Sequence, residues 1–329
     1  MEENKNIQEQ PLLKVEDLVV HYETDSGVVE AINNVSFSLK KGETLGLVGE
    51  TGAGKTTIAK SIMGILPVPP SHIIDGKIFF EGDDLLKKNK KELQKYRGKK
   101  MSMIFQDPMT ALNPVKSVGY QIAEVISLHE KVSKLEAKLK AQEMMKVVGI
   151  DPSRYDEFPH QFSGGMKQRI VIAIALACEP ELLIADEPTT ALDVTIQAQV
   201  LDLMNDLKKK YNTSMIMITH DLGIVLEVCD KCAVVYAGEI VEYGTIKDIF
   251  TNAQHPYTIG LFNSLPRLDI DAGRLKPIPG LMSDPTDLPE YCSFYDRCER
   301  RCENCKKGDP VLEEVEPGHF VKCFCKKEA

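Results

Sequence analysis

The chain has 329 residues, and its 43% hydrophobic content is enough for a sizeable core. The net charge of −9 disfavours nucleic acid as the main partner, because phosphate binding requires a basic surface. The N-terminal stretch MEENKNIQEQ lacks the basic and apolar regions of a signal peptide, and the longest apolar run, residues 170–178, is shorter than the about 20 residues that cross a bilayer. We therefore expect a cytosolic protein, in which disulfides rarely persist.

The clearest chemical motif is GETGAGKTT, residues 49–57, between the apolar stretch TLGLV and the helix-forming TTIAKSIMGIL. Gly49, Gly54, Lys55 and Thr56 match G-x-x-x-x-G-K-[ST] in the strand–loop–helix context that this phosphate-binding motif requires. We expect Lys55 to reach the β- and γ-phosphates of a nucleotide and Thr56 to bind Mg²⁺. The other loop residues, whose backbone would curl around the phosphates, are Glu50, Thr51, Gly52, Ala53 and Thr57.

A helix is predicted over residues 133–149, SKLEAKLKAQEMMKVVG. Ser133 and Glu136 form a capping-box pattern at its start, and a glycine ends it. The apolar residues expected to share one face of this helix are Leu135, Leu139 and Met145.

A buried parallel strand is predicted by the apolar run at residues 182–185 in ELLIADEPTTALD. The run ends in Asp186 and Glu187. A carboxylate at the end of a strand beside a phosphate loop suits Mg²⁺ coordination, here by Asp186, and Glu187 could polarise an attacking water. The alternative interpretation is that D-E-P only terminates the strand at a turn.

With the segment FSGGMKQR, residues 162–169, the chain resembles the ATP-binding-cassette (ABC) ATPases. The segment is similar to the family's LSGGQ signature, with Phe162 and Met166 as departures. A helix N-terminus there would face phosphate, and in this family it serves the nucleotide of the opposite subunit. The residues that the resemblance assigns to this role are Ser163, Gly164 and Gly165.

Four further motifs follow in the family's order. Gln106 in IFQDP resembles the Q-loop glutamine, and Asp193 in TALD resembles the D-loop. His220 in MIMITHD resembles the switch histidine that touches the γ-phosphate, and Tyr22 in VHYETDSG resembles the aromatic residue that stacks on adenine. A lone histidine or tyrosine of this kind is normally a packing or solvated residue, so the ordered set carries the resemblance.

The resemblance implies an α/β fold: a RecA-like P-loop ATPase core with an N-terminal antiparallel β subdomain, a helical insertion subdomain and a C-terminal Cys-rich extension. We expect the nucleotide-binding domain over residues 1–245, its helical subdomain at about 107–178, and the extension over 246–329. The implied ligands are ATP and Mg²⁺. The implied catalytic residues are Glu187, His220 and Gln106, and the implied Mg²⁺ ligands are Thr56, Gln106 and Asp186.

The C-terminal part resembles a narrower subfamily. HPYTIGLFNSLPRLD, residues 255–269, is similar to the segment that follows the core in oligopeptide, dipeptide and nickel importers. IPGLMSDPTDLPEYCSFYDRC resembles their proline-rich approach to a cysteine tail ending in C-x-F-x-x-R-C. The chain most resembles the D-type ATPase of a dipeptide or oligopeptide importer. The residues that fit the tail pattern are Cys292, Phe294, Arg297 and Cys298.

Six of the nine cysteines lie in residues 291–325. Four thiolates can hold Zn²⁺ or a [4Fe–4S] cluster, which spacing alone separates poorly, and free thiols are the third possibility. Some members of the resembled subfamily carry a [4Fe–4S] cluster on this tail, and the ligands implied here are Cys292, Cys298, Cys305 and Cys323, with Cys302 and Cys325 as extras.

Two other cysteines form a C-x2-C pair elsewhere. Cys229 and Cys232 flank the run AVVYAG, so we expect them in the apolar core and not on a metal. Because Lys55 and Tyr22 belong to the predicted core, we also expect ATP affinity to be independent of the cysteine tail.

The resemblance implies an ATPase that powers import of dipeptides or oligopeptides, peripheral on the cytoplasmic face of the bacterial cell membrane. Its implied partners are a second ABC ATPase in a heterodimer, two membrane permeases and an external peptide-binding protein, with no nucleic acid. The alternatives are the same engine for another cargo such as nickel, or a soluble ABC ATPase in DNA or ribosome work. The short segment between Lys55 and Ser163 has no room for the long coiled coils of DNA-maintenance relatives, which favours transport.

Overall fold

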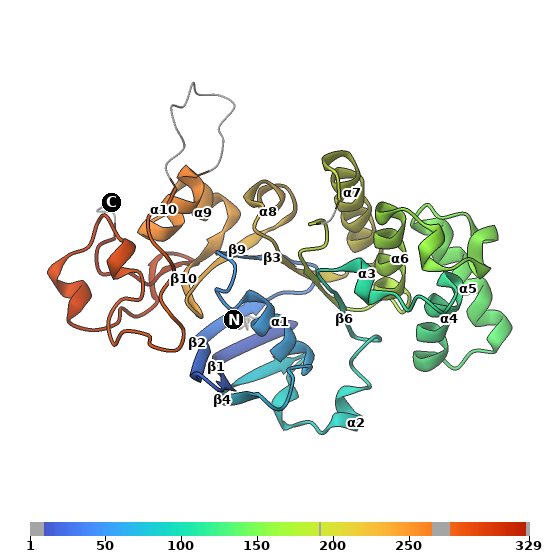
Figure 1. The fold of residues 1–329 in the computed structure, drawn as a ribbon, viewed down its shortest axis with the longest axis horizontal. Helices are drawn as coiled ribbons and strands as arrows, with labels where there is room; N and C mark the ends of the chain where they lie inside the picture. Colours follow the sequence, from blue (N-terminus) through green and yellow to red (C-terminus); the bar gives the residue numbers. More distant parts are fainter. Residues whose placement is uncertain (1–9, 191, 265–276, 327–329) are drawn as a thin grey trace, which may run out of the picture.

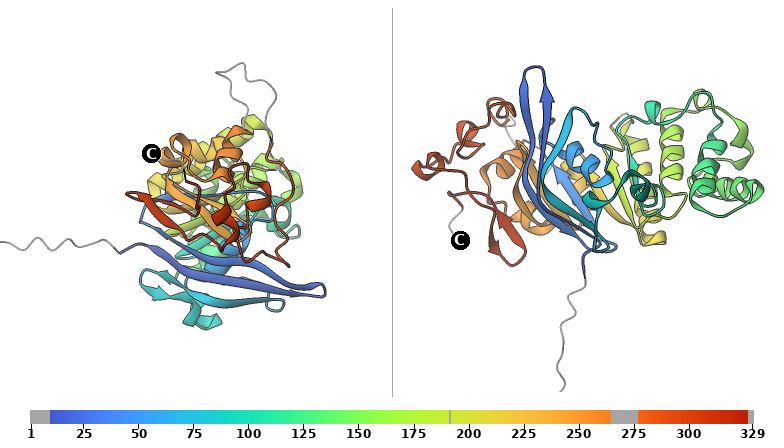
Figure 2. Two further views of the ribbon diagram at one scale, coloured as in Figure 1. Left: turned by 90° about the vertical axis from the view of Figure 1, so that its left-hand side faces the viewer. Right: turned by 90° about the horizontal axis from the view of Figure 1, so that it is seen from below.

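The computed structural model describes residues 10–190, 192–264 and 277–326, so the expected segment 255–269 is described as far as Ser264. Residues 1–9 of the N-terminal stretch and 265–276 lie outside the described residues. The fold is α/β, as predicted, with a helical part at one end of a central sheet and the C-terminal extension at the other (Figures 1 and 2). Among the described residues, no helix combines the length and apolar character needed to span a membrane.

The central sheet has the order β11-β12-β10-β9-β3-β8-β7-β6 over the described residues. Its strands β9, β3, β8, β7 and β6 run parallel, and the hairpin partner β10 and the strands β12 and β11 are antiparallel to their neighbours. Every residue of β3, β6, β7 and β8 is buried, which explains why these strands are continuous apolar runs. The strands are β3 (Thr44–Val48), β6 (Met101–Ile104), β7 (Leu182–Asp186), β8 (Ser214–Ile218), β9 (Lys231–Tyr236), β10 (Glu239–Thr245), β11 (Glu313–Glu316) and β12 (His319–Val321).

A second, antiparallel sheet covers one face of the central sheet. Helix α1 (Lys55–Met63) lies with it in a shared apolar core. Alternation along β3 separates the two faces, because Leu47 points into this core and Val48 into the opposite one. The sheet has the order β2-β1-β4-β5, with strands β1 (Leu13–Thr24), β2 (Gly27–Leu39), β4 (Ser71–Phe80) and β5 (Asp83–Asp84), and the short helix α2 (Lys90–Leu93) follows it.

Helices cover the other face of the central sheet. Their buried residues share one apolar core with the predicted core cysteines Cys229 and Cys232, which are 8% and 1% exposed and confirm that prediction. The helices on this face are α6 (Gly164–Leu176), α7 (Val194–Tyr211) and α8 (Leu222–Val228). The helical part beyond them contains α3 (Pro108–Ala111), α4 (Val118–His129) and α5 (Lys134–Val147).

Helix α5 begins with the predicted capping box, in which Ser133 and Glu136 each accept the other's backbone N–H. The prediction of one shared apolar face was wrong. Leu135 and Leu139 are 68% and 53% exposed, whereas Met145 is fully buried. Six residues turn a helix by about 240°, so Met145 cannot lie above Leu139. The residues that face the interior with it are Ala137, Ala141 and Met144.

The extension begins with α9 (Ile246–Thr251) and α10 (Pro256–Asn263) and returns to the central sheet through β12. Its attachment centres on Glu242 of β10, which is completely buried. The Glu242 carboxylate accepts the backbone N–H groups of Gln254 and His255, at 2.8 and 2.9 Å, and lies 2.8 Å from Nε2 of the buried His319. One carboxylate therefore joins β10, the start of α10 and β12. The hydrogen bond to Glu242 raises the pKa of His319.

The charged form of His319 should stabilise the fold. Since its folded pKa is raised, its contribution is complete below the unfolded value of about 6.5 and is lost as pH rises through the folded pKa. We expect His319→Phe to lower the free energy of unfolding by about 3–5 kcal/mol at about pH 6 and by less at about pH 9. Urea unfolding across pH measures this difference. His72→Phe, at a half-exposed histidine of β4, is the control and should change little. A His319→Phe effect that is the same at every pH would contradict a charged pair.

Candidate functional site

The predicted motifs meet at one edge of the central sheet. The glycine-rich loop follows β3 and His220 follows β8, while Glu187 follows β7 and Gln106 follows β6. These four strands are neighbours and run parallel, so their carboxyl ends lie side by side. Ligands of open α/β sheets bind at this edge, and the sequence order of the motifs is thereby converted into a single site.

The glycine-rich loop is tightly confined. Gly49 has φ +148°, and a Cβ atom there would lie 2.1 Å from the carbonyl oxygen of Val235, so only glycine fits. The Lys55 ammonium is buried and donates to the carbonyl oxygens of Gly49 and Glu50, each at 2.8 Å. Burial lowers the pKa of Lys55, and the nearby carboxylates of Glu187 and Asp186 oppose that shift. The Lys55 amine is thus held against the glycine-rich loop, with which it is predicted to bind phosphate.

Thr56 and Asp186 lie together at the start of α1 and the end of β7. The Thr56 hydroxyl donates to Oδ2 of Asp186 at 3.0 Å. Burial raises the pKa of Asp186, the charge of Glu187 adds to this, and the Thr56 hydrogen bond opposes it. A hydroxyl and a carboxylate are oxygen donors of the kind that Mg²⁺ prefers, so this pair fits the predicted metal.

Glu187 contacts several other side chains of the site. It has φ +47°, an uncommon conformation for a residue with a side chain, and its N–H donates to the carbonyl of Ile218 at 2.8 Å. Its carboxylate accepts from Gln106 Nε2 at 3.0 Å and from the Thr190 hydroxyl at 2.9 Å, and His220 Nδ1 lies 3.4 Å away. Burial alone would raise the pKa of Glu187, but the bonds from Thr190 and His220 outweigh it and the pKa is lowered. The carboxylate is therefore kept ionised.

These groups surround a cavity of about 370 Å³, a size typical of small-ligand sites. The predicted residues that line it are Thr51, Gly52, Gly54, Lys55, Thr56, Thr57, Gln106, Glu187 and His220. Tyr22 stands beside them, with its hydroxyl 3.3 Å from that of Thr57. The lining also includes residues that the sequence did not indicate, namely Val29, Glu30, Ala31, Ala237 and Gly238 of the core and Met282 and Pro285 of the extension.

The structure does not bring the signature to this cavity. Ser163 caps α6 by accepting the N–H of Met166 at 3.4 Å, and Asp193 caps α7 by accepting the N–H of Ile196 at 3.0 Å. The two helix starts are neighbours, since a Cβ on Gly165 would lie 2.5 Å from Ile196 Cγ2. The described residues that line the cavity do not include Ser163, Gly164, Gly165 or Asp193.

The four cysteines of the predicted ligand set are all buried, with exposures between 4% and 9%. Burial raises the pKa of Cys292 to about 12, and the charges of Cys305, Cys323 and Cys298 add to the shift. Burial and the charge of Cys298 likewise raise the pKa of Cys323. The Cys292 and Cys323 thiols therefore each feel the charge of other cysteines of the predicted set.

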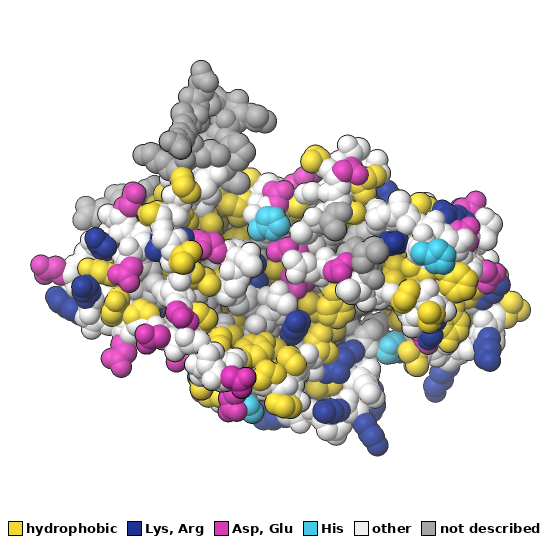
Figure 3. Space-filling view, viewed as in Figure 1, with side chains coloured by type: hydrophobic (Ala, Val, Ile, Leu, Met, Phe, Trp, Pro, Cys, Tyr) yellow, Lys and Arg dark blue, Asp and Glu magenta, His cyan; other side chains and the backbone are white. Residues whose placement is uncertain are grey.

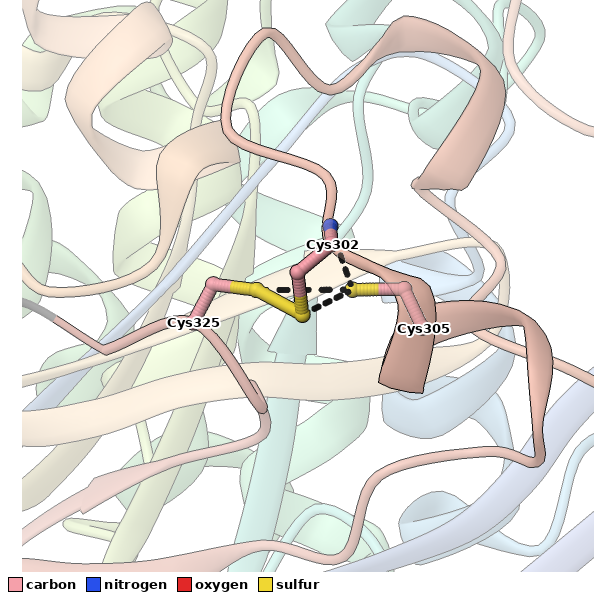
Figure 4. Close-up of side chains that lie close together, drawn as sticks. All are labelled: Cys302, Cys305 and Cys325. Atoms are coloured by element: carbon pink, nitrogen blue, oxygen red, sulfur yellow. Dashed lines mark hydrogen bonds between the residues drawn. A yellow bond between two sulfur atoms is a disulfide. The ribbon is translucent and has the colours of Figure 1, made fainter.

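A tighter group overlaps this set. Cys302 and Cys325 are joined in a disulfide, and the Cys305 Sγ lies 3.5 Å from that of Cys302 and 3.6 Å from that of Cys325 (Figure 4). If the disulfide is reduced to thiolates, the three sulfurs lie close enough to hold one metal ion. Of this triad only Cys305 belongs to the predicted ligand set, and the two extras that the sequence left unassigned complete it.

Two protein families match the chain. The ABC transporter family matches residues 32–190, and the family described as "Oligopeptide/dipeptide transporter, C-terminal region" matches residues 241–305. The chain is 51% identical to the oligopeptide transport ATP-binding protein OppD of Bacillus subtilis, over 95% of this chain and 88% of the relative. It is 50% identical to the dipeptide transport ATP-binding protein DppD of the same organism, over 95% and 94%.

Solved structures support the fold. The ATP-binding cassette MJ0796, in a dimeric post-hydrolysis state bound to ADP and Pi, covers 71% of this chain and 98% of its own, with a TM-score of 0.64 and 24% identity. CbiO1 of Clostridium perfringens, part of the ABC transporter complex cbiONQ, covers 74% and 92%, with a TM-score of 0.63 and 29% identity. With its relatives at about half identity over nearly the whole chain, the protein belongs to the oligopeptide and dipeptide transport ATP-binding proteins of the ABC transporter family.

Proposed function

We propose that the chain hydrolyses ATP to power uptake of oligopeptides or dipeptides through a membrane transporter. The observation that carries the proposal is the meeting of the glycine-rich loop, Glu187 and His220 around one cavity, with Asp186 hydrogen-bonded to Thr56 of its lining. The similarity of residues 241–305 to the oligopeptide and dipeptide C-terminal region, and the peptide cargo in the relatives' names, favour peptides over nickel. The same similarity favours transport over DNA or ribosome work.

Each side chain of the site has a role in this chemistry. Thr56 and Asp186 would hold Mg²⁺, with Gln106 beside them, and the ion would neutralise charge on the phosphates. Lys55 and His220 would stabilise the charge that develops on the γ-phosphate. Glu187 is ionised, accepts hydrogen bonds from Gln106 and Thr190 and has His220 beside it, so its carboxylate is oriented to polarise the attacking water.

A complete site requires a second ATPase subunit. Ser163 and Gly164 are exposed and lie apart from the chain's own cavity, which leaves them free to contact the nucleotide of a neighbour. The dimeric state of the solved cassette MJ0796 supports the same arrangement. We propose a heterodimer of two such ATPases, with an external peptide-binding protein completing the transporter.

The helical part offers a surface for the membrane permeases. Leu128 of α4 and Leu135 and Leu139 of α5 are 73%, 68% and 53% exposed, although the two helices pack on each other. Hydrophobic side chains also gather on this part of the face shown in Figure 3. Exposed apolar residues in one region mark interaction sites, so we propose that the permeases bind here and hold the ATPase at the cytoplasmic face of the membrane.

We further propose that Cys292, Cys298, Cys305 and Cys323 hold a [4Fe–4S] cluster. The supporting observation is that all four thiols are buried within the extension. When bound, the cluster would organise a segment with few apolar residues and would play no part in ATP chemistry.

The triad of Cys302, Cys305 and Cys325 favours zinc as the second candidate once a thiol reductant has converted the Cys302–Cys325 disulfide to two thiolates. Its three sulfurs lie within 4.8 Å of one another, close enough for a single ion. The two proposals share Cys305 and differ in every other ligand, so single substitutions separate them.

The catalytic proposal predicts that Glu187→Gln keeps ATP binding and lowers ATP turnover by about 10²–10⁴-fold, because the amide cannot polarise water. Lys55→Ala should weaken binding and turnover together. ATP affinity and hydrolysis are measured in the assembled transporter. The matched control is Glu181→Gln. Glu181 directly precedes the first residue of β7, at the end of the strand away from the site, so this variant should keep wild-type turnover. Near wild-type turnover in Glu187→Gln would remove its assigned role.

The assembly proposal predicts that the isolated chain binds ATP, hydrolyses it slowly and is mostly monomeric at low concentration. Ser163→Arg should leave ATP binding by the isolated chain unchanged, because Ser163 is outside its cavity, but should lower turnover in the complete transporter. Light scattering with and without ATP and steady-state hydrolysis test both points. Vigorous hydrolysis by a strict monomer is the result that contradicts the proposal.

The cluster proposal predicts a brown protein after anaerobic purification, with absorbance near about 400 nm and about four irons per chain. Cys298→Ser should abolish the absorbance, whereas Cys302→Ser should retain it. Zinc on the triad predicts the reverse pattern, with one zinc lost in Cys302→Ser and kept in Cys298→Ser. Cys178→Ser, a half-buried cysteine of the core, should change neither metal. The absence of any metal under anaerobic conditions would contradict both proposals.

A further inference from the structure

The extension forms hydrogen bonds with Glu50 of the glycine-rich loop through two of its side chains. The buried Tyr257 of α10 accepts the Glu50 backbone N–H through its hydroxyl oxygen at 2.9 Å. Arg297 donates through both terminal nitrogens to the two carboxylate oxygens of Glu50, at 2.9 and 3.0 Å. A two-pronged bond between guanidinium and carboxylate fixes orientation as well as distance. Backbone and side chain of the same loop residue are therefore both held from the extension.

Arg297 is itself fixed on every side. Its Nε donates to the carbonyl of Pro279 at 2.9 Å, and its side chain is only 7% exposed. The guanidinium carbon lies 5.7 and 5.9 Å from the ring centres of Tyr236 and Phe294. Phe294 packs edge-on against Tyr236 and Tyr257. Arg297 is therefore held in one orientation and links the extension to the glycine-rich loop. This Arg297–Glu50 link is called the strut below.

Arg297 lies in the turn that runs from Cys292 to Cys298, called here the cysteine turn. Arg297 directly precedes Cys298 and closes the short helical turn Tyr295–Arg297. That turn starts on Cys292, whose carbonyl accepts the N–H of Tyr295 at 2.9 Å. Two cysteines of the proposed cluster therefore bracket the arginine, and the fold of this turn sets where the guanidinium points.

Glu50 also contacts Lys55, the lysine predicted to bind ATP. The peptide unit between Gly49 and Glu50 donates its N–H to Tyr257 and accepts the Lys55 ammonium at its Gly49 carbonyl, so it is tied to the extension and to Lys55, which also donates to the Glu50 carbonyl. The extension also forms part of the cavity wall through Met282 and Pro285, and the Pro285 carbonyl accepts the N–H of Glu30 at 2.8 Å. ATP would therefore bind between the core and the extension.

We propose that Arg297 is a positioning residue for ATP: by holding Glu50 it sets the glycine-rich loop and Lys55 in their phosphate-binding geometry, and it couples this geometry to the folded cysteine turn. The inference rests on the proposed ATP-hydrolysing function. It makes the extension part of the nucleotide site, with the cysteine turn as the element that aligns the strut.

The test compares the wild type with Arg297→Gln, Glu50→Gln and the double variant in the full-length chain. Binding of ATP is measured directly, and metal content reports whether the cysteine turn is intact. Each single variant should weaken ATP affinity about tenfold, and the double variant should be no weaker than a single one, because both changes remove the same contact. Arg301→Gln, an exposed arginine of the same tail that stacks on Tyr295, is the matched control and should bind ATP normally.

Kinetics in the assembled transporter separate positioning from general destabilisation. Loss of the strut should raise KM for ATP about tenfold and change kcat by less than about threefold. A variant that only misfolds would lower kcat through lost active molecules and leave KM unchanged. Arg297→Lys keeps the charge and loses the fork, so its ATP affinity should fall between those of the wild type and Arg297→Gln.

Three results would overturn the inference: unchanged ATP affinity in Glu50→Gln, additive losses in the double variant, or an equal loss in Arg301→Gln. If Arg297→Gln loses its metal, Glu50→Gln decides alone, since it leaves the cysteine turn untouched. A wild-type transporter that fails to hydrolyse ATP would instead contradict the proposed function. Normal wild-type hydrolysis with unaffected variants would contradict only the strut.

Discussion

Four buried apolar strands that run parallel, β3, β8, β7 and β6, determine where everything else in the molecule lies. Most of their side chains face apolar cores on both sides, with the small buried hydroxyl of Ser102 as an exception, so a polar ligand cannot bind in the middle of the sheet. The chain can become polar only where the strands end, and parallel strands end together. Gly49, Glu187, His220 and Gln106 meet because each follows a strand that cannot itself be polar.

This constraint explains why so much of the site could be predicted. An apolar run followed by glycines and a lysine, or by two carboxylates, predicts both the strand and the position of the functional group at its end. Lys55, Thr56, Asp186 and Glu187 were identified in this way, and the structure brings them together. The capping box of α5 was equally predictable because Ser133 and Glu136 are neighbours in sequence.

What the sequence did not indicate depends on contacts between distant segments. Arg297 matched a tail pattern, but nothing in that pattern shows that its guanidinium reaches Glu50, 247 positions away. Met282 lies in an irregular segment without periodicity, yet it lines the cavity. The expectation that ATP affinity is independent of the tail rested on the core alone and did not anticipate that Arg297 bonds to Glu50 of the phosphate loop. The error on Leu135 and Leu139 was of another kind: apolar character was equated with burial, although small alanines make the packed face.

The buried carboxylate of Glu242 has a consequence for how this protein can be divided. A fragment ending at β10 would lose the two backbone N–H groups and the His319 ring that satisfy the carboxylate, and would leave a desolvated charge without partners. It would also lose β12, so β10 would become a bare strand edge open to pairing with other chains. We therefore expect that the residues resembling a self-sufficient ATPase do not fold stably when the extension is removed. In this chain the extension acts as the closing strand of the sheet, and a boundary drawn from motifs alone would cut through a continuous hydrogen-bonded surface.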